Sequence, residues 1–113
     1  MTTTTTTTPT KRTVVRYEIE PARREEHEAL IRAVFAELAE VRPSGLAYQA
    51  MKLEDGVTFV HLAVVSTPDG KNPLLELAAF KAFTANIGER CRVKPVSASA
   101  LAIGAFRAPD APA

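Results

Sequence analysis

Apolar and polar residues alternate with the period of a β-strand in several parts of the chain. The first such part predicts a strand over Thr13–Glu20, with Val15, Tyr17 and Ile19 on one face. Two more strands are predicted over 46–53 and 57–66. Between them stands the dipeptide Asp55-Gly56, which is typical of a tight hairpin turn.

Apolar residues recur with helical spacing in two other segments. In Ala22–Val41 they form one stripe, which predicts a helix ended by the Pro43 and Gly45 region. A second helix is expected with Asn72 as its N-cap and Pro73 at its first position, and it ends near Arg92. Its apolar face carries Leu74, Leu77, Phe80, Phe83 and Ile87. A last strand is predicted over 96–107.

The predicted order of elements is β-α-β-β-α-β, the split βαβ arrangement of an α+β, ferredoxin-like fold with an antiparallel sheet. Both helices of such a unit cover one face of the sheet. The strand over 57–66 is nevertheless apolar on both faces, with Val60, Leu62 and Val64 on one side and Phe59, Ala63 and Val65 on the other. We therefore expect a homodimer in which two sheets pack open face to open face.

Length and composition narrow the class of protein. The chain has 113 residues, of which 46% are hydrophobic, and a net charge of +1. We expect one folded domain over 11–107, with disordered tails over 1–10, which is rich in threonine, and 108–113. The chain has neither the basic patch of a nucleic-acid binder nor an apolar run long enough to span a membrane. With one cysteine and no signal peptide, a cytoplasmic location is expected.

Two stretches carry a resemblance to a known family. PSGLAYQAMKLEDGVTFVHL and NPLLELAAFKAF are similar to segments of the antibiotic biosynthesis monooxygenase-like (ABM) family of dimeric α/β-barrel proteins, over about 12–107. Pro43 and Gly45 match the turn of that family, and Tyr48 matches its strand aromatic. The resemblance implies a dimeric barrel with a ligand cavity between sheet and helices. It also implies oxygenation of a small electron-rich aromatic, of phenol, anthrone or quinol type, without a metal or other cofactor. The chain has no tryptophan, which argues against the haem-degrading branch.

His61 is the first candidate for chemistry, because a histidine among apolar strand residues could act as a general base toward a phenol. Arg16 could stabilise the oxyanion that forms. Tyr48, Tyr17, Gln49 and Phe59 are the candidates for contacting the substrate. The structural alternatives are a hydrogen-bonded histidine of the core or the dimer interface, an ion pair of Arg16 with Glu18 or a partner strand at the sheet edge or interface, and ordinary aromatic packing.

Three further residues have mainly structural interpretations. Asn72 is expected to cap a helix, His27 to lie on a solvated helix face, and Cys91 to be unreactive. The chain lacks CxxC, HExxH, GxSxG and Walker A motifs, so the sequence predicts no metal site and no serine nucleophile. The alternatives to a monooxygenase are a dimeric protein that binds a small hydrophobic ligand without turnover or has a structural role, and an isomerase or decarboxylase that uses the same His61.

Overall fold

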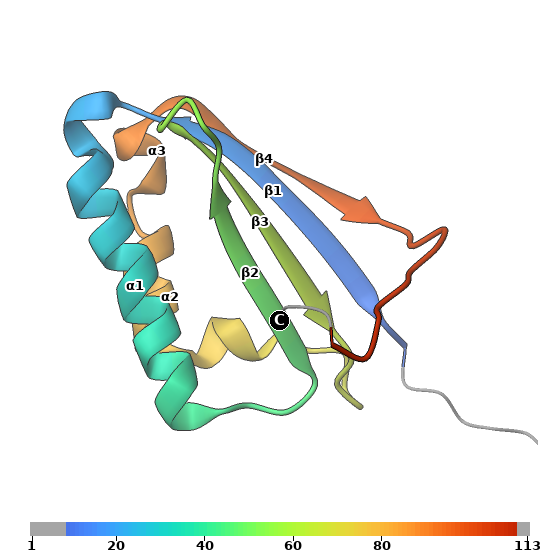
Figure 1. Cartoon of the computed structure of the whole chain (residues 1–113). Helices are drawn as coiled ribbons and strands as arrows, with labels where there is room; N and C mark the ends of the chain where they lie inside the picture. The colour runs from blue at the N-terminus through green and yellow to red at the C-terminus, as the bar shows by residue number, and fades with distance from the viewer. Residues whose placement is uncertain (1–8, 111–113) are drawn as a thin grey trace, which may run out of the picture.

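A four-stranded antiparallel sheet forms the centre of the computed structural model, which describes residues 9–110 (Figure 1). The sheet has the strand order β2-β3-β1-β4. Its strands are β1 (Lys11–Ile19), β2 (Leu46–Lys52), β3 (Thr58–Val65) and β4 (Cys91–Ala100). The predicted α+β, ferredoxin-like order of elements is therefore confirmed. The predicted tails over 1–10 and 108–113 lie largely outside the described residues.

The two central strands divide their side chains as the alternation predicted. In β1 and β3 the odd-numbered residues face the helices, and they include the buried Tyr17, Ile19, Phe59, Ala63 and Val65. Val15 lies opposite His61 in the strand register, so His61 belongs to this buried face as well. Burial of these aromatic and branched side chains, at about 25 cal/mol per Å² of apolar surface, is the main favourable term that holds the sheet to its helices.

The first helical segment follows the prediction closely. A 3-10 turn, η1 (Pro21–Arg23), leads into α1 (Arg24–Val41). The helix ends at Arg42, which adopts a left-handed conformation with φ 49° and donates its backbone N–H to the carbonyl of Leu38. Val34, in the middle of α1, is buried against the sheet.

The second helical segment is not the one continuous helix that the apolar spacing predicts. It consists of η2 (Pro73–Glu76), α2 (Ala78–Thr84) and α3 (Ile87–Arg90). The backbone is extended at Leu77, with ψ 130°, and left-handed at Asn86, with φ 61°, which separates the three pieces. The predicted apolar face still packs inward. The second break changes the direction of the chain before Arg90 and leaves that residue buried.

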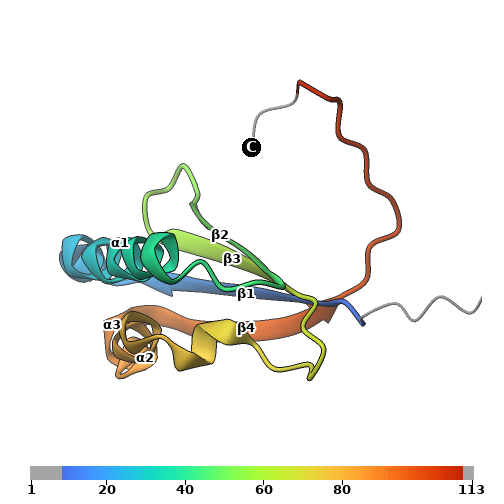
Figure 2. The same ribbon diagram turned by 90° about the horizontal axis from the view of Figure 1, so that it is seen from below.

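The last strand also departs from its prediction. It runs over Cys91–Ala100, whereas the sequence pattern indicated 96–107. Pro95 is accommodated because β4 is an edge strand that pairs with β1 alone. Ala100 lies opposite Arg12, close to the start of β1, so the residues beyond it have no strand to pair with. They run away from the sheet (Figure 2), with Leu101, Ile103 and Phe106 exposed.

The helices cover one face of the sheet, and no helix of residues 9–110 covers the other (Figures 1 and 2). On this open face β3 presents Val60, Leu62 and Val64, all half-buried. Arg16 lies opposite Val60 and Gln49 opposite Leu62, so both belong to the open face. Among the described residues, no helix has the length and apolar character needed to cross a lipid bilayer.

Candidate functional site

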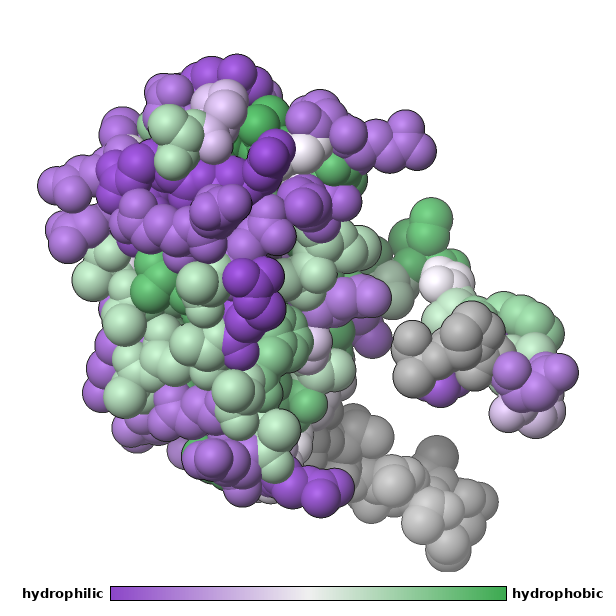
Figure 3. Space-filling model, turned by 60° about the vertical axis from the view of Figure 1, so that its left-hand side comes forward, coloured by the Kyte–Doolittle hydropathy of each residue, from purple (hydrophilic) through white to green (hydrophobic). Residues whose placement is uncertain are grey.

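A pocket of about 230 Å³ lies between the helix-facing side of the sheet and the second helical segment. Side chains from all four strands form one wall, and Asn72 with residues of η2, α2 and α3 forms the other. The lining residues are Thr13, Val15, Tyr17, Tyr48, His61, Ala63, Asn72, Leu74, Phe80, Phe83, Thr84, Ile87 and Pro95. Figure 3 shows the side of the molecule that bears the helices, where apolar residues occupy the middle of the view below a polar upper end. Such a pocket suits a small, largely apolar ligand.

Five side chains form a continuous chain of hydrogen bonds that begins at the pocket. The Tyr48 hydroxyl lies 2.6 Å from Nδ1 of His61, and Nε2 of His61 lies 2.7 Å from the Tyr17 hydroxyl. The Tyr17 hydroxyl lies 2.6 Å from Nε2 of His27. Finally, Nε of Arg90 donates to Nδ1 of His27 over 3.1 Å. We call these five residues the relay.

Both histidines of the relay are buried, with exposed fractions of 0% for His27 and 4% for His61. Burial lowers the pKa of His61 to about 4. Burial, and then the positive charge of Arg90, lowers the pKa of His27 to about 4 as well. Burial raises the pKa of Tyr17 and that of Tyr48. At neutral pH the histidines are therefore neutral and both tyrosines keep their protons.

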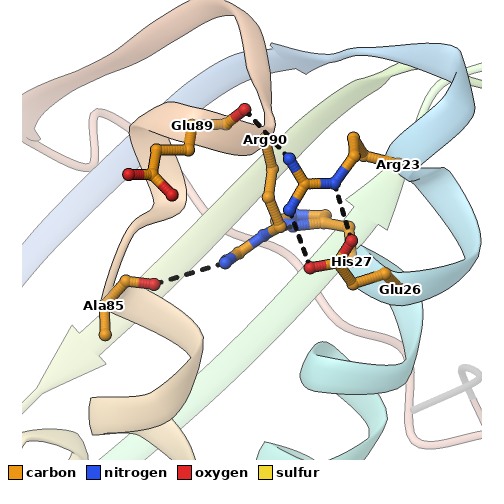
Figure 4. Close-up of polar contacts among 6 residues, drawn as sticks. All are labelled: Arg23, Glu26, His27, Ala85, Glu89 and Arg90. Carbon is orange, nitrogen blue, oxygen red and sulfur yellow. Dashed lines mark hydrogen bonds and ion pairs between the residues drawn. The ribbon is translucent and has the colours of Figure 1, made fainter.

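Arg90 is a buried cation at the far end of the relay, with an exposed fraction of 3%. Its guanidinium donates to the backbone carbonyls of Phe83 and Ala85 in addition to His27. Within 9–110 it forms no ion pair. The nearby carboxylate of Glu26 pairs with Arg23 instead, as Figure 4 shows. The positive charge is thus balanced by dipoles rather than by a carboxylate.

The structure brings together most of the site residues expected from the sequence. His61, Tyr48 and Tyr17 are consecutive members of the relay, and the ring of Phe59 stacks on that of Tyr17 with 5.6 Å between centroids. Phe59 is buried beneath them and is not among the residues that line the pocket.

Arg16 and Gln49 do not join this group. Both side chains are exposed on the open face of the sheet, on the opposite side from His61. Arg16 therefore cannot stabilise an anion in the pocket of its own chain.

His27 was expected on a solvated helix face, and that prediction is wrong, because it is fully buried. The sequence does hold a signal for its burial: His27 precedes Ile31 and Val34 by four and seven residues, which continues the apolar stripe of α1 toward its start. Arg90 was not singled out either. No sequence pattern marks its burial, which depends on the break in the chain at Asn86.

The remaining expectations concern Asn72 and Cys91. The side chain of Asn72 accepts a hydrogen bond of 2.9 Å from the backbone N–H of Leu74, so its predicted capping role is confirmed. Burial raises the pKa of the Cys91 thiol, which disfavours the reactive thiolate. Across the described residues, no three His, Cys, Asp or Glu side chains cluster in a way that could hold a metal ion.

No protein-family model matches the sequence, and no curated protein is significantly similar to it. Solved structures do share its fold. Rv0793 from Mycobacterium tuberculosis is 14% identical, with a TM-score of 0.71, and the match covers 88% of this chain and 100% of that one. SnoaB from Streptomyces nogalater, described as a cofactor-independent oxygenase, is 17% identical over 86% of this chain and 96% of its own, with a TM-score of 0.64.

A third structure, described as an antibiotic biosynthesis monooxygenase, is 14% identical, with a TM-score of 0.65 over 83% of this chain and 99% of that chain. These matches extend over almost the whole length of each neighbour. The resemblance predicted from the sequence is therefore confirmed for the fold: this chain has the ferredoxin-like α+β fold of structures described as antibiotic biosynthesis monooxygenases.

Proposed function

We propose that this chain is a monooxygenase of the cofactor-independent type, which binds a small electron-rich aromatic molecule in the pocket. The observation that carries the proposal is the position of the Tyr48 hydroxyl, which lies 2.6 Å from His61 in a pocket lined mainly by aromatic and aliphatic side chains. In an apolar cavity whose few polar groups lie together, those groups bind the oxygen substituent of an aromatic ring and so set the orientation of the ring. The description of SnoaB as a cofactor-independent oxygenase supports this class of reaction.

The proposed chemistry uses the substrate as its own reductant. An anthrone or phenol that has lost its proton can pass electrons to dioxygen directly. When a CH₂ group becomes C=O, it gives up four electrons; one oxygen atom of O₂ stays in the product and the other leaves as water. Atoms and electrons balance without an external reductant. The role of the protein is to bind the substrate anion and stabilise its negative charge. Preorganised hydrogen-bond donors are most effective at stabilising such a charge.

The geometry favours an indirect role for His61. Its two ring nitrogens already bond to Tyr48 and Tyr17, and with a pKa of about 4 it is a weak base. We therefore propose that Tyr48 contacts the substrate oxygen, while His61 is a positioning residue that holds the Tyr48 hydroxyl. In this scheme the substrate proton leaves to water at the open side of the pocket.

Oxygen uptake tests the proposal. We would supply a panel of anthrones, hydroquinones and phenols in the presence of a chelator, and use ¹⁸O₂ to follow the label. Consumption of one O₂ per substrate, with one labelled atom in the product, is the expected result. Saturable binding of the same compounds with no oxygen uptake would contradict it.

That contrary result would favour the second candidate, a protein that binds a small aromatic ligand without turnover. One observation supports this candidate. Every buried side-chain polar atom of the described residues has a hydrogen-bond partner, so none stands ready as a base.

We also propose that the open sheet face mediates a homodimer. Val60, Leu62 and Val64 place three branched apolar side chains on a face that no helix of residues 9–110 covers. A second copy with twofold symmetry would cover them with the same three residues. Sedimentation at micromolar concentration tests this, and a monodisperse monomer would contradict it.

A further inference from the structure

We propose that Arg90 fixes the direction of every hydrogen bond in the relay, so that Tyr48 offers its O–H to the pocket and the site selects a ligand with an acceptor oxygen, an oxyanion or a carbonyl. The ligand part of this inference rests on the proposed function, because it takes the pocket as the binding site. The directional part depends only on the contacts of the five relay residues.

The direction starts at Arg90, because a guanidinium carries donors and no acceptor. Its Nε–H can only donate to Nδ1 of His27, which must therefore present a lone pair. A neutral imidazole has one proton, so that proton sits on Nε2 of His27. From there it donates to the oxygen of Tyr17, 2.6 Å away.

The same logic passes through the next two residues. The Tyr17 oxygen accepts from His27, so its single hydrogen is used toward Nε2 of His61. His61, also neutral, must then carry its proton on Nδ1. That proton donates to the Tyr48 oxygen over 2.6 Å. The hydrogen of Tyr48 is left with no partner in the relay.

The opposite direction would place a proton on Nδ1 of His27. That proton would meet the Nε–H of Arg90 head on, with the two nitrogens 3.1 Å apart. Doubly protonated histidines are no alternative at neutral pH, because both histidines are buried and the nearest cation, Arg90, has no carboxylate partner within the described residues. The direction that ends on Tyr48 avoids this clash and leaves only the Tyr48 hydrogen without a partner in the relay.

Tyr17, His61 and Tyr48 all line the pocket, but of these three only Tyr48 has a hydrogen that the relay does not use. Its ring stacks on Phe35 at 5.2 Å and meets Phe80 edge-on at 6.4 Å, so its position is fixed by packing. A ligand oxygen that accepts the Tyr48 hydrogen completes the relay. A ligand that can only donate leaves this hydrogen unpaired, which should weaken its binding by roughly 10-fold to 100-fold.

The charge on Arg90 acts in the same sense. It is a buried cation without an ion pair among the described residues, and the neutral relay connects it to the pocket. A negative charge placed at Tyr48 lies at the end of a line of dipoles that all point their positive ends toward it. The site should thus bind a phenolate more tightly than the corresponding neutral phenol.

The first test is the tautomer of each histidine, read from the ¹⁵N chemical shifts of the imidazole nitrogens in the protein without ligand. His27 should be protonated at Nε2 and His61 at Nδ1, which is the less common form of a neutral histidine in water. Tyr17→Phe cuts the relay between the two histidines, and His61 should then change to the Nε2–H form. Arg92→Gln is the matched control for removal of an arginine, because Arg92 pairs with Glu18 on the surface; it should change neither tautomer.

The second test uses 4-nitrophenol, whose absorbance distinguishes its ionised and neutral forms. Bound to the wild type, its apparent pKa should fall by about one unit relative to the free compound, since one good donor is worth about that much. Tyr17→Phe should remove most of this shift, because Tyr48 can then turn its hydrogen toward His61. Arg90→Gln should do the same, and if that variant fails to fold, Tyr17→Phe carries the test alone.

The outcomes separate this inference from the proposed function. Neither measurement needs oxygen or turnover, so a failed oxygen-uptake assay leaves both intact. A wild-type His61 protonated at Nε2 would overturn the directional relay and leave the oxygenase proposal standing. Correct tautomers with nitrophenol bound in its neutral form, or not bound, would overturn the selection of an acceptor ligand.

Discussion

Tyr48 and His61 are joined diagonally across the hairpin rather than face to face. In the β2–β3 register Tyr48 lies opposite Ala63, and His61 lies opposite Ala50. The Tyr48 hydroxyl nevertheless reaches within 2.6 Å of His61 Nδ1. Diagonal neighbours in an antiparallel sheet are about 7–8 Å apart, so only long side chains can make this contact. The small Ala63 and Ala50 leave room for it.

Tyr48→Phe should therefore remove the hydroxyl that ends the relay and leave Nδ1 of His61 without its partner. The ring keeps its stacking on Phe35, while the donor toward the proposed substrate is lost. We expect kcat/KM for oxygen uptake to fall by roughly 100-fold, as it does when one preorganised donor to an anion is removed. The assay is steady-state oxygen consumption with the best compound of the panel.

Gln49→Ala is the matched control, because Gln49 is the next residue of β2 and lies exposed on the opposite face. It should leave kcat/KM unchanged within about twofold. Equal losses in the two variants would show that Tyr48 acts through strand stability and does not contact the substrate.

Directly before β2 lies a glycine that both its backbone conformation and the atoms next to it require. Gly45 has φ 76°, and a Cβ placed on it would lie 2.8 Å from the carbonyl oxygen of Ser66 and 2.9 Å from the Thr67 side chain. The Ser66 N–H donates to the Gly45 carbonyl over 2.8 Å, so the backbone has little freedom to move away. Gly45→Ala should lower the free energy of unfolding by about 2–4 kcal/mol.

Comparison with Gly70→Ala separates the cost of the steric contact at Gly45 from the cost of the left-handed conformation. Gly70 has nearly the same φ, 74°, but apart from its chain neighbours no atom of residues 9–110 lies within 4 Å of the place that a Cβ would take. It should cost only the left-handed strain of about 1 kcal/mol. Urea unfolding of both variants measures the difference, and equal costs would mean that the Gly45 backbone relaxes away from Ser66.

The faces of the hairpin were predictable because they depend on local chemistry. Alternation places Phe59, His61 and Ala63 on one side whatever covers them, and Asp55-Gly56 fixes the register of the two strands. Alternation cannot show which of the two faces the helices cover. The covered face is set by the path of the chain after β1. Because the helices cover the face of Tyr48, Gln49 and Arg16 lie on the opposite face, outside the pocket.

The far end of the relay was beyond the reach of sequence patterns for a different reason. Arg90 is buried because Asn86 turns the chain in the left-handed region and three acceptors then meet its guanidinium. Two of these are backbone carbonyls, which any sequence supplies. The burial of His27 was easier to predict, because His27 continues the apolar stripe of α1. The two flanking glutamates instead favoured the interpretation that His27 lies on a solvated helix face.

The open sheet face gives a prediction for assembly. Leu62 lies at the centre of the apolar face of β3, paired with Val14 on one side and Gln49 on the other. If a second copy covers this face, Leu62→Lys places two like charges in a twofold interface. We expect a dimer at micromolar concentration for the wild type and a monomer for Leu62→Lys in analytical ultracentrifugation.

Ala36→Lys is the control for an added charge, because Ala36 is exposed on α1. It should leave the sedimentation coefficient of the dimer unchanged. A wild type that sediments as a monomer, or a Leu62→Lys variant that remains a dimer, would remove the open face from the proposed interface.

Acid should destabilise the protein through its two histidines. His27 and His61 are the only histidines of the chain, and both have a native pKa of about 4 against about 6.5 when unfolded. Between these values the unfolded chain binds more protons than the native state. The free energy of unfolding is therefore highest above pH 6.5 and falls as the pH is lowered toward 4, by up to about 1.4 kcal/mol per pH unit for each histidine.

Urea unfolding at several pH values between 7.5 and 5 measures this slope. Asp55, whose pKa is lowered to about 2 by its hydrogen bonds to Thr58 and Val57, loses its proton well below that range and does not contribute. A His27→Gln variant should lose about half of the slope, because one of the two titrating groups is gone, even though its overall stability is lower. If stability were flat between pH 7.5 and 5, the two imidazoles would have to be solvated in the native state, and the relay would not exist as a buried chain.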